Sequence, residues 1–157
     1  MPYRAEPSRG FVSPKPDDLK AIITDAGAAQ TLDRVSDGLG QALAQPLATS
    51  QIRSLYGEVI RIKANWLENR DSSEQGRKRK ERARRAFILL KPKMAYRAKK
   101  ESGKSRGVED LVSVLLPAME YVSETPKQSG ETIDDNFRRF VEFFEAILAY
   151  HRAYGGK

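Results

Sequence analysis

Cysteine, histidine and long apolar runs are missing or scarce in this 157-residue sequence. The absence of cysteine excludes disulfides and thiolate metal sites, and a single histidine leaves any zinc site to be built almost wholly from carboxylates. No run approaches the roughly 18 apolar residues that cross a membrane, and residues 1–18 lack the apolar centre of a signal peptide. We therefore expect a cytoplasmic protein without structural metal.

Positive charge is plentiful, and most of it is local. The net charge is +7, yet residues 77–106 alone carry 14 lysines and arginines against Glu81 and Glu101, a net +12. The rest of the chain is therefore mildly acidic. A basic block on an acidic body is typical of a surface that binds a polyanion such as RNA or DNA. The alternative is a solvated charged face or a disordered basic loop.

Apolar residues recur every three or four positions, and no segment alternates as a strand does. We predict an all-α fold, a single-domain helical bundle of about five helices with proline kinks over residues 19–157. The core should come chiefly from 52–67, 86–98, 108–122 and 133–154, with weaker helices at 17–25 and 28–45. Residues 1–18 hold four of the eight prolines and are expected to form a flexible arm.

Two segments carry candidate phosphate contacts. In the helix over 49–69, Arg53 and Arg61 flank Gly57 on the polar side and leave a smooth, positive surface, unless they are merely solvated. Pro92 should kink the next helix or start a new one. Five basic residues cluster around that bend: Lys91, Lys93, Arg97, Lys99 and Lys100. We expect the neighbouring Tyr96 to fill the core, the alternative being a ring that stacks on a base.

The basic run near 70–85 has no apolar face, so it should be a solvated helix extension or a mobile loop. The final helix is its opposite, because it has a wide apolar sector. Its first strip consists of Phe137, Phe140, Val141, Phe144, Ile147, Leu148, His151 and Tyr154, and a second consists of Phe143, Ala146 and Tyr150. Such a helix should lie centrally or at a contact with another subunit. Gly155 and Gly156 should end it.

No active site emerges from the sequence. His151 is the only residue that titrates near neutrality, and its place on the apolar strip favours packing. Glu142 and Glu145 have the spacing of a solvated helix face, and Gly103 and Gly107 do not lie between a strand and a helix as a phosphate loop would. We predict a protein that is not an enzyme and needs no cofactor.

Three segments together resemble one family. They are "ATSQIRSLYGEV" at 48–59, "LLKPKMAYRAKK" at 89–100 and "FRRFVEFFEAILAYHRAYGG" at 137–156. Their order and spacing are similar to those of the small subunit of the type III-A CRISPR effector complex, the Csm complex. With the connecting helices the resemblance covers most of 39–156, whereas residues 1–30 and the run "GRKRKERARR" match nothing specific.

The resemblance implies a helical, non-enzymatic subunit present in several copies along the belly of the complex. Its partners would be guide RNA, target RNA, the repeated backbone subunit, the large subunit and copies of itself. RNA and DNA cleavage would belong to other subunits. By matched position, the RNA contacts would be Arg53 in the first segment and, in the second, Lys91, Lys93, Arg97 and Lys99.

Two other classes stay open at this point. A stand-alone DNA-binding regulator would need two helices joined by a tight turn, with base-reading side chains opening the second. The basic cluster instead opens a helix whose later part is core, so we expect no such motif. A protein-interaction scaffold with incidental charge would differ from an RNA-binding subunit by failing to bind single-stranded RNA.

Overall fold

The computed structural model describes residues 3–103, 105–124 and 130–157, and the described residues form six α-helices and no strand. The helices are α1 (Pro16–Thr24), α2 (Ala29–Leu43), α3 (Thr49–Trp66), α4 (Glu74–Glu101), α5 (Gly107–Val122) and α6 (Gly130–Ala153). The all-α prediction is confirmed, with six helices in place of about five. Pro16, Asp17 and Asp18 start the short α1, because proline fits a first turn and acidic groups complement the helix dipole there.

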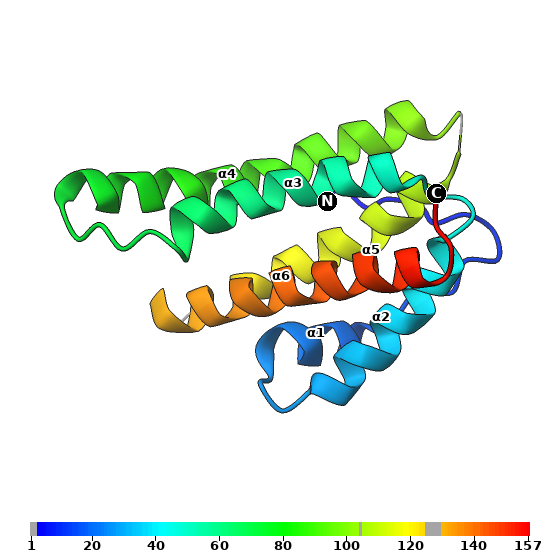
Figure 1. Cartoon of the computed structure of the whole chain (residues 1–157), viewed down its shortest axis with the longest axis horizontal. Coiled ribbons are helices and arrows are strands. Elements are labelled where there is room, and N and C mark those ends of the chain that lie inside the picture. Colours follow the sequence, from blue (N-terminus) through cyan, green and yellow to red (C-terminus); the bar gives the residue numbers. More distant parts are fainter. Residues whose placement is uncertain (1–2, 104, 125–129) are drawn as a thin grey trace.

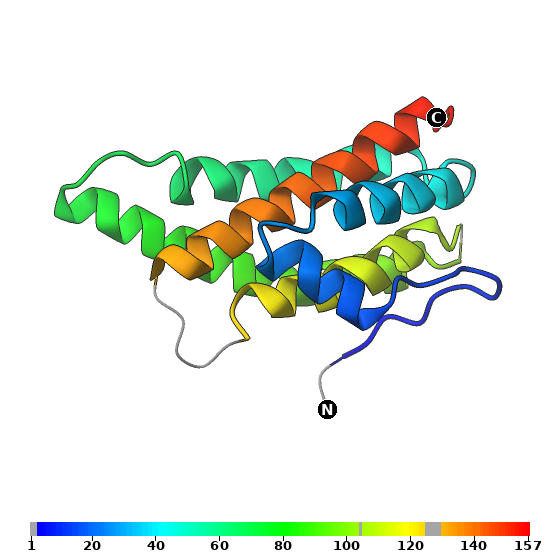
Figure 2. The same cartoon turned by 90° about the horizontal axis from the view of Figure 1, so that it is seen from below.

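The helices form three layers (Figure 1). The α3 and α4 helices lie side by side in one layer, α5 and α6 form the middle, and α1 and α2 cover the other side (Figures 1 and 2). The α6 helix touches α1, α2, α3 and α5. Other helices of the same chain therefore cover its wide apolar sector, since Phe143 of the second strip and Phe144 of the first are both fully buried.

Aromatic side chains fill the contact between α6 and the α3–α4 layer. Trp66 stacks on Phe137 with ring centroids 4.1 Å apart, and Phe87 meets both rings edge-on. Farther along, Tyr56 meets Phe144 at 5.3 Å. Buried aromatic rings of this size dominate core energetics, so this cluster fixes how α3 and α4 sit on α6.

The α2 and α6 helices approach very closely at Gly40. A Cβ atom there would collide with the backbone of α6 at Tyr150 and His151. Beside this point, the Tyr150 hydroxyl donates to Asp33 Oδ1 at 2.5 Å, and this hydrogen bond raises the pKa of Tyr150 to about 12. Gly40 weakens α2 as an isolated helix but permits the contact that buries it.

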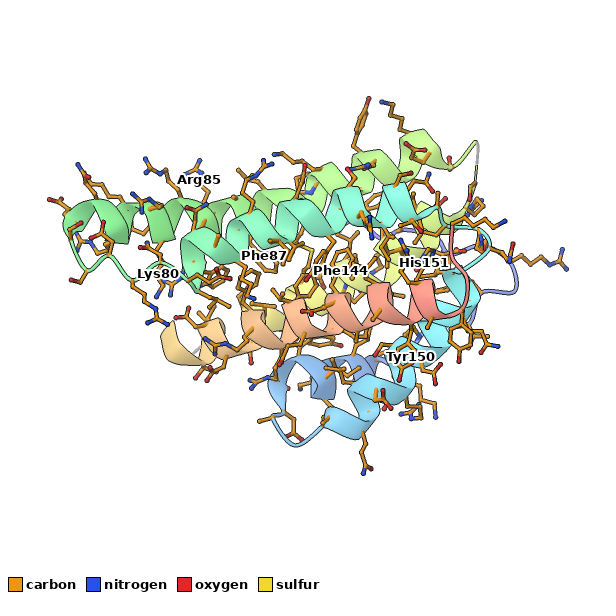
Figure 3. The ribbon with its side chains drawn as sticks, in the orientation of Figure 1. Lys80, Arg85, Phe87, Phe144, Tyr150 and His151 are labelled. Carbon is orange, nitrogen blue, oxygen red and sulfur yellow. The ribbon has the colours of Figure 1, made fainter. Side chains whose placement is uncertain are left out.

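His151 is a packing residue, as its position on the apolar strip predicted. It is fully buried, and its Nε2 lies 2.6 Å from the carbonyl oxygen of Leu47. Figure 3 places it between α6 and the α3 layer. The chain then turns at Gly155, whose φ of 84° is left-handed, and Gly156 lies against the imidazole ring. The amide of Gly156 donates to the His151 carbonyl, which completes a Schellman ending.

The structure corrects one position of that strip. Tyr154 is 42% exposed, and its hydroxyl donates to Asp37 in the middle of α2. Because α6 ends at Ala153, Tyr154 falls in the turn that leaves the helix, where the three-and-four spacing no longer holds its side chain inward.

Both prolines within the helices are accommodated. The α4 helix runs for 28 residues through Pro92, and α5 runs through Pro117, so Pro92 starts no new helix. The basic run from Arg77 to Arg85 forms the first turns of α4.

Before α1, residues 3–15 have no regular secondary structure. In this segment the amide and the hydroxyl of Ser8 both donate to the buried carboxylate of Asp110 on α5. Among the described residues, no helix has both the length and the apolar character to cross a membrane.

Candidate nucleic-acid interface

The outer layer of α3 and α4 carries all seven predicted contact residues. The two helices are antiparallel: Gln51 at the start of α3 donates to Glu101 at the end of α4 at 3.2 Å, and Trp66 at the end of α3 packs on Phe87. Arg53, Arg61, Lys93, Lys99 and Lys100 are exposed, and Lys91 and Arg97 are half-buried. Within the described part of the chain none of the seven forms an ion pair, so their charges are free to meet an anion.

On α3 the predicted row is intact. Arg53, Gly57 and Arg61 follow one another at intervals of four and are all exposed. A Cβ at Gly57 would meet nothing within 4 Å, so packing within this chain does not require glycine there. The row is a smooth strip with a cation at each end.

On α4 the predicted residues divide between two faces. Lys93, Arg97 and Lys100 are spaced by four and three residues and share one face. Lys91 lies two residues before Lys93 and therefore points to a different side of the helix. Lys91 lies two turns after Arg84, on the same side of α4, and Arg84 pairs with Asp134 of α6. The structure thus groups three of the five α4 cations and leaves Lys91 and Lys99, which are eight residues apart, off their face.

The prediction that Tyr96 fills the core is wrong. Its side chain is 70% exposed. The buried positions of this part of α4 are Phe87, Leu90, Met94 and Ala98, and Tyr96 lies midway between the last two on the opposite side of the helix. Ile88 and Leu89 are also about half exposed on the outer surface. An exposed aromatic ring among basic side chains is the type of group that stacks on an unpaired base.

Asp134 on α6 forms ion pairs with two cations of the basic run, Lys80 and Arg84. Its carboxylate accepts from Trp66 Nε1 at 2.5 Å, Arg84 Nη2 at 3.0 Å and Lys80 Nζ at 3.2 Å. The Arg84 guanidinium also lies 5.4 Å from the centre of the Trp66 ring. Figure 3 shows Lys80 directed toward the start of α6. Lys80 and Arg84 therefore serve the fold, which the sequence alone did not show.

These contacts set the ionisation of Asp134. Partial burial alone would raise the pKa of this carboxyl, but the hydrogen bonds from Trp66, Arg84 and Lys80 outweigh burial, and the pKa is lowered. The carboxylate is therefore charged at neutral pH and ties α3, α4 and α6 together.

The other cations of the run behave differently from these two. Arg77 and Lys78 lie near Glu74, at 3.9 and 3.8 Å, as exposed pairs on the first turns of α4. Arg79, Arg82 and Arg85 form no ion pair among the described residues. Arg85 points away from the body (Figure 3). The positive charge available to a partner is thus concentrated on the outer and α3-facing sides of α4.

The exposed side chains of this surface are of the types that can bind an anion. Across the described residues, no three histidine, aspartate or glutamate side chains gather as a metal site would require. The one histidine is buried in the core, with its Nε2 beside the carbonyl oxygen of Leu47.

Comparison with known proteins assigns the chain to a family. A family model described as Csm2 Type III-A matches residues 26–157, which span α2 to α6 and leave α1 and the preceding residues outside. Comparison with curated proteins and with solved structures found no match. The match covers most of the chain and agrees with the resemblance of the three sequence segments. The protein therefore belongs to the Csm2 Type III-A family, the small structural subunit of the type III-A CRISPR effector complex.

Proposed function

We propose that this protein is a non-catalytic, RNA-binding structural subunit of a cytoplasmic type III-A effector ribonucleoprotein. In this role several copies stack along the duplex of guide RNA and target RNA, beside the repeated backbone subunit and the large subunit. The α3–α4 layer faces the RNA. The observation that carries the proposal is the local +12 charge of residues 77–106, much of it on exposed side chains that have no carboxylate partner among the residues the structure describes.

The residue types fit a duplex that is read by base pairing. When guide and target recognise each other, the protein beside them needs phosphate and sugar contacts, which fix position but carry no sequence information. Arginine and lysine supply such contacts. The smooth α3 strip around Gly57 allows a sugar-phosphate backbone to approach between Arg53 and Arg61.

A DNA-binding regulator is less well supported. Only four residues, 25–28, join α1 and α2, close to the short connection that the predicted helices over 17–25 and 28–45 implied, and a helix-turn-helix motif could use this length. The α2 helix, however, carries Asp33 and Asp37, which accept hydrogen bonds from Tyr150 of α6 and from Tyr154 just after it. Carboxylates on a recognition helix would repel DNA phosphates, so α2 does not fit that role.

The test measures how RNA affinity depends on salt. For single-stranded RNA, each neutralised phosphate contributes about −0.7 to the slope of log affinity against log salt. Replacing Lys91, Lys93 and Arg97 together with alanine should flatten this slope for the isolated protein. A matched control replaces Lys15, Lys20 and Arg152, which are exposed cations outside the α3–α4 layer, and removes the same charge.

The control variant should retain most of the slope of the unmodified protein. Equal slopes for the unmodified protein and the α4 variant would remove these three residues from the RNA surface. Failure of the unmodified protein to bind any single-stranded RNA would instead favour a protein-interaction scaffold.

A further inference from the structure

A cavity of about 410 Å³ opens between α3 and the first half of α4. Arg61 of α3 and Arg79 and Arg82 of α4 line it, and its apolar part comes from Ile62, Ala83 and Ala86. The residues that line it lie toward the α3–α4 connection, the end at which this helical hairpin projects beyond the rest of the molecule (Figures 1 and 2). Three arginines from two helices therefore line one hollow of the surface.

The rotation of α4 explains why these arginines meet. Asp134 holds Lys80 and Arg84 on the side of α4 that faces α6. Arg79, Arg82 and Ala86 follow one another at intervals of three and four residues, so they form a separate row, and this row faces α3. Ala83 and Ala86 are too small to fill the space between the helices. The same ion pairs that anchor α4 thus turn two unpaired arginines toward Arg61.

No carboxylate in the described structure neutralises the three groups. Glu58, one turn before Arg61, forms no ion pair with it. The charge of Arg79 has only a small electrostatic effect on the Asp71 carboxylate. The pKa of Asp71 is lowered chiefly by hydrogen bonds from Ser73, with the charge of Arg79 a smaller cause. Like charges gathered without a partner repel one another, and a bound anion relieves this repulsion. The planar, forked guanidinium suits the oxygens of a phosphate.

We propose that the Arg61–Arg79–Arg82 pocket binds backbone phosphates of RNA. This inference rests on the proposed function and extends its contact surface to the run "GRKRKERARR", which the family resemblance left without a role. The RNA path then runs along the whole length of α4, from the Lys93, Arg97 and Lys100 face to the projecting end of the hairpin.

The experiment compares two double variants of the full-length protein with equal loss of charge. R79Q/R82Q removes the α4 part of the pocket, and R77Q/K78Q removes two neighbouring cations that already lie beside Glu74. Binding of single-stranded oligouridylate is measured against salt. R79Q/R82Q should flatten the slope by about 0.7 for each phosphate that the pocket no longer neutralises, whereas R77Q/K78Q should change it much less. Both variants should melt like the unmodified protein, because all four side chains are exposed.

Each outcome decides a different question. Equal effects of the two double variants would show that only net charge matters and would overturn the pocket, while the Lys91, Lys93 and Arg97 variant still tests the proposed function. Poly-glutamate that competes as well as RNA of equal charge would make this a site for an acidic protein surface and would overturn the phosphate assignment. R79K/R82K keeps the charge but loses the fork, and it should bind with intermediate strength; full binding would contradict the geometric argument.

Discussion

Tyr96 shows how one residue can change its meaning when its surroundings are known. In the sequence it stands beside Met94 and Ala98, both of which are core residues, and its aromatic ring favours burial. In the structure it is 70% exposed and lies on the outer face with Ile88 and Leu89. Neighbouring cations would hold a phosphate chain close to its ring, so the base-stacking interpretation becomes the stronger one.

Replacing Tyr96 with alanine should weaken binding of single-stranded RNA and leave stability almost unchanged. Base stacking on an aromatic ring typically contributes about 1 to 3 kcal/mol, and an exposed side chain adds little to folding. Tyr96→Phe keeps the ring and should bind like the unmodified protein. Fluorescence anisotropy with labelled RNA and thermal unfolding measure the two effects. If Tyr96→Ala and Tyr96→Phe bind RNA equally well, stacking at this position is wrong.

At the scale of elements, α4 carries cations that are paired within the fold on one side and cations that are free to bind a partner on its other sides. Its α6 side carries Lys80 and Arg84 on Asp134, while its outer and α3 sides carry arginines without ion pairs among the described residues. A helix that is polar through its first turns has few apolar contacts to stabilise it. The Asp134 cluster supplies the missing anchor and stabilises the projecting end of the hairpin.

Because of the Asp134 cluster, the free energy of unfolding should decrease at acid pH. Because the folded-state pKa of Asp134 lies below its ordinary value of 3.8, its contribution is fully present above that value. The contribution is lost as the pH falls through the lower, folded-state pKa. At neutral pH, Asp134→Asn should cost about 1 to 3 kcal/mol, since charged hydrogen bonds to Lys80 and Arg84 are weakened.

Urea unfolding at a series of pH values, for both the unmodified protein and Asp134→Asn, isolates this effect because all other carboxylates are shared. The difference in unfolding free energy should shrink as the pH falls below about 4. A difference that stays constant from neutral to acid pH would mean that Asp134 contributes through its shape rather than its charge.

At the scale of the whole molecule, α6 is the central element of the three layers. It packs on α1, α2, α3 and α5, and both of its apolar strips are used within the chain near Phe143 and Phe144. A wide apolar sector on a terminal helix is thus no evidence for a subunit contact here. The exposed apolar groups of the α3–α4 layer, such as Ile88 and Leu89, lie on the opposite side of that layer from the core.

Phe143→Glu should abolish folding of the isolated protein. The side chain is fully buried, and a charge placed there has no partner and cannot reach water. Ala149→Glu, an exposed position on the same helix, controls for the added charge and should fold normally. Circular dichroism and cooperative melting report both outcomes. A Phe143→Glu protein that melts like the unmodified one but fails to join the complex would show that this strip faces a partner.

Features that depend on neighbours along one helix could be predicted from the sequence. The all-α class, most of the inward strip of α6, the glycine ending and the packing role of His151 all follow from three-and-four spacing and local turn chemistry. The three family segments and the local +12 charge are also properties of the sequence alone. The seven proposed RNA contacts remain predictions, because they depend on a partner that is separate from this chain.

Only the tertiary structure decided which helix covers which face. The burial of Phe143, the exposure of Tyr96 and the close approach at Gly40 depend on where α2, α3 and α5 lie around α6 and α4. The division of the basic run depends on Asp134, which lies 50 residues beyond Arg84 in sequence and 3.0 Å from it in space. Spacing fixes which side chains share a face of α4, but a distant carboxylate determines which of its cations are paired within the fold.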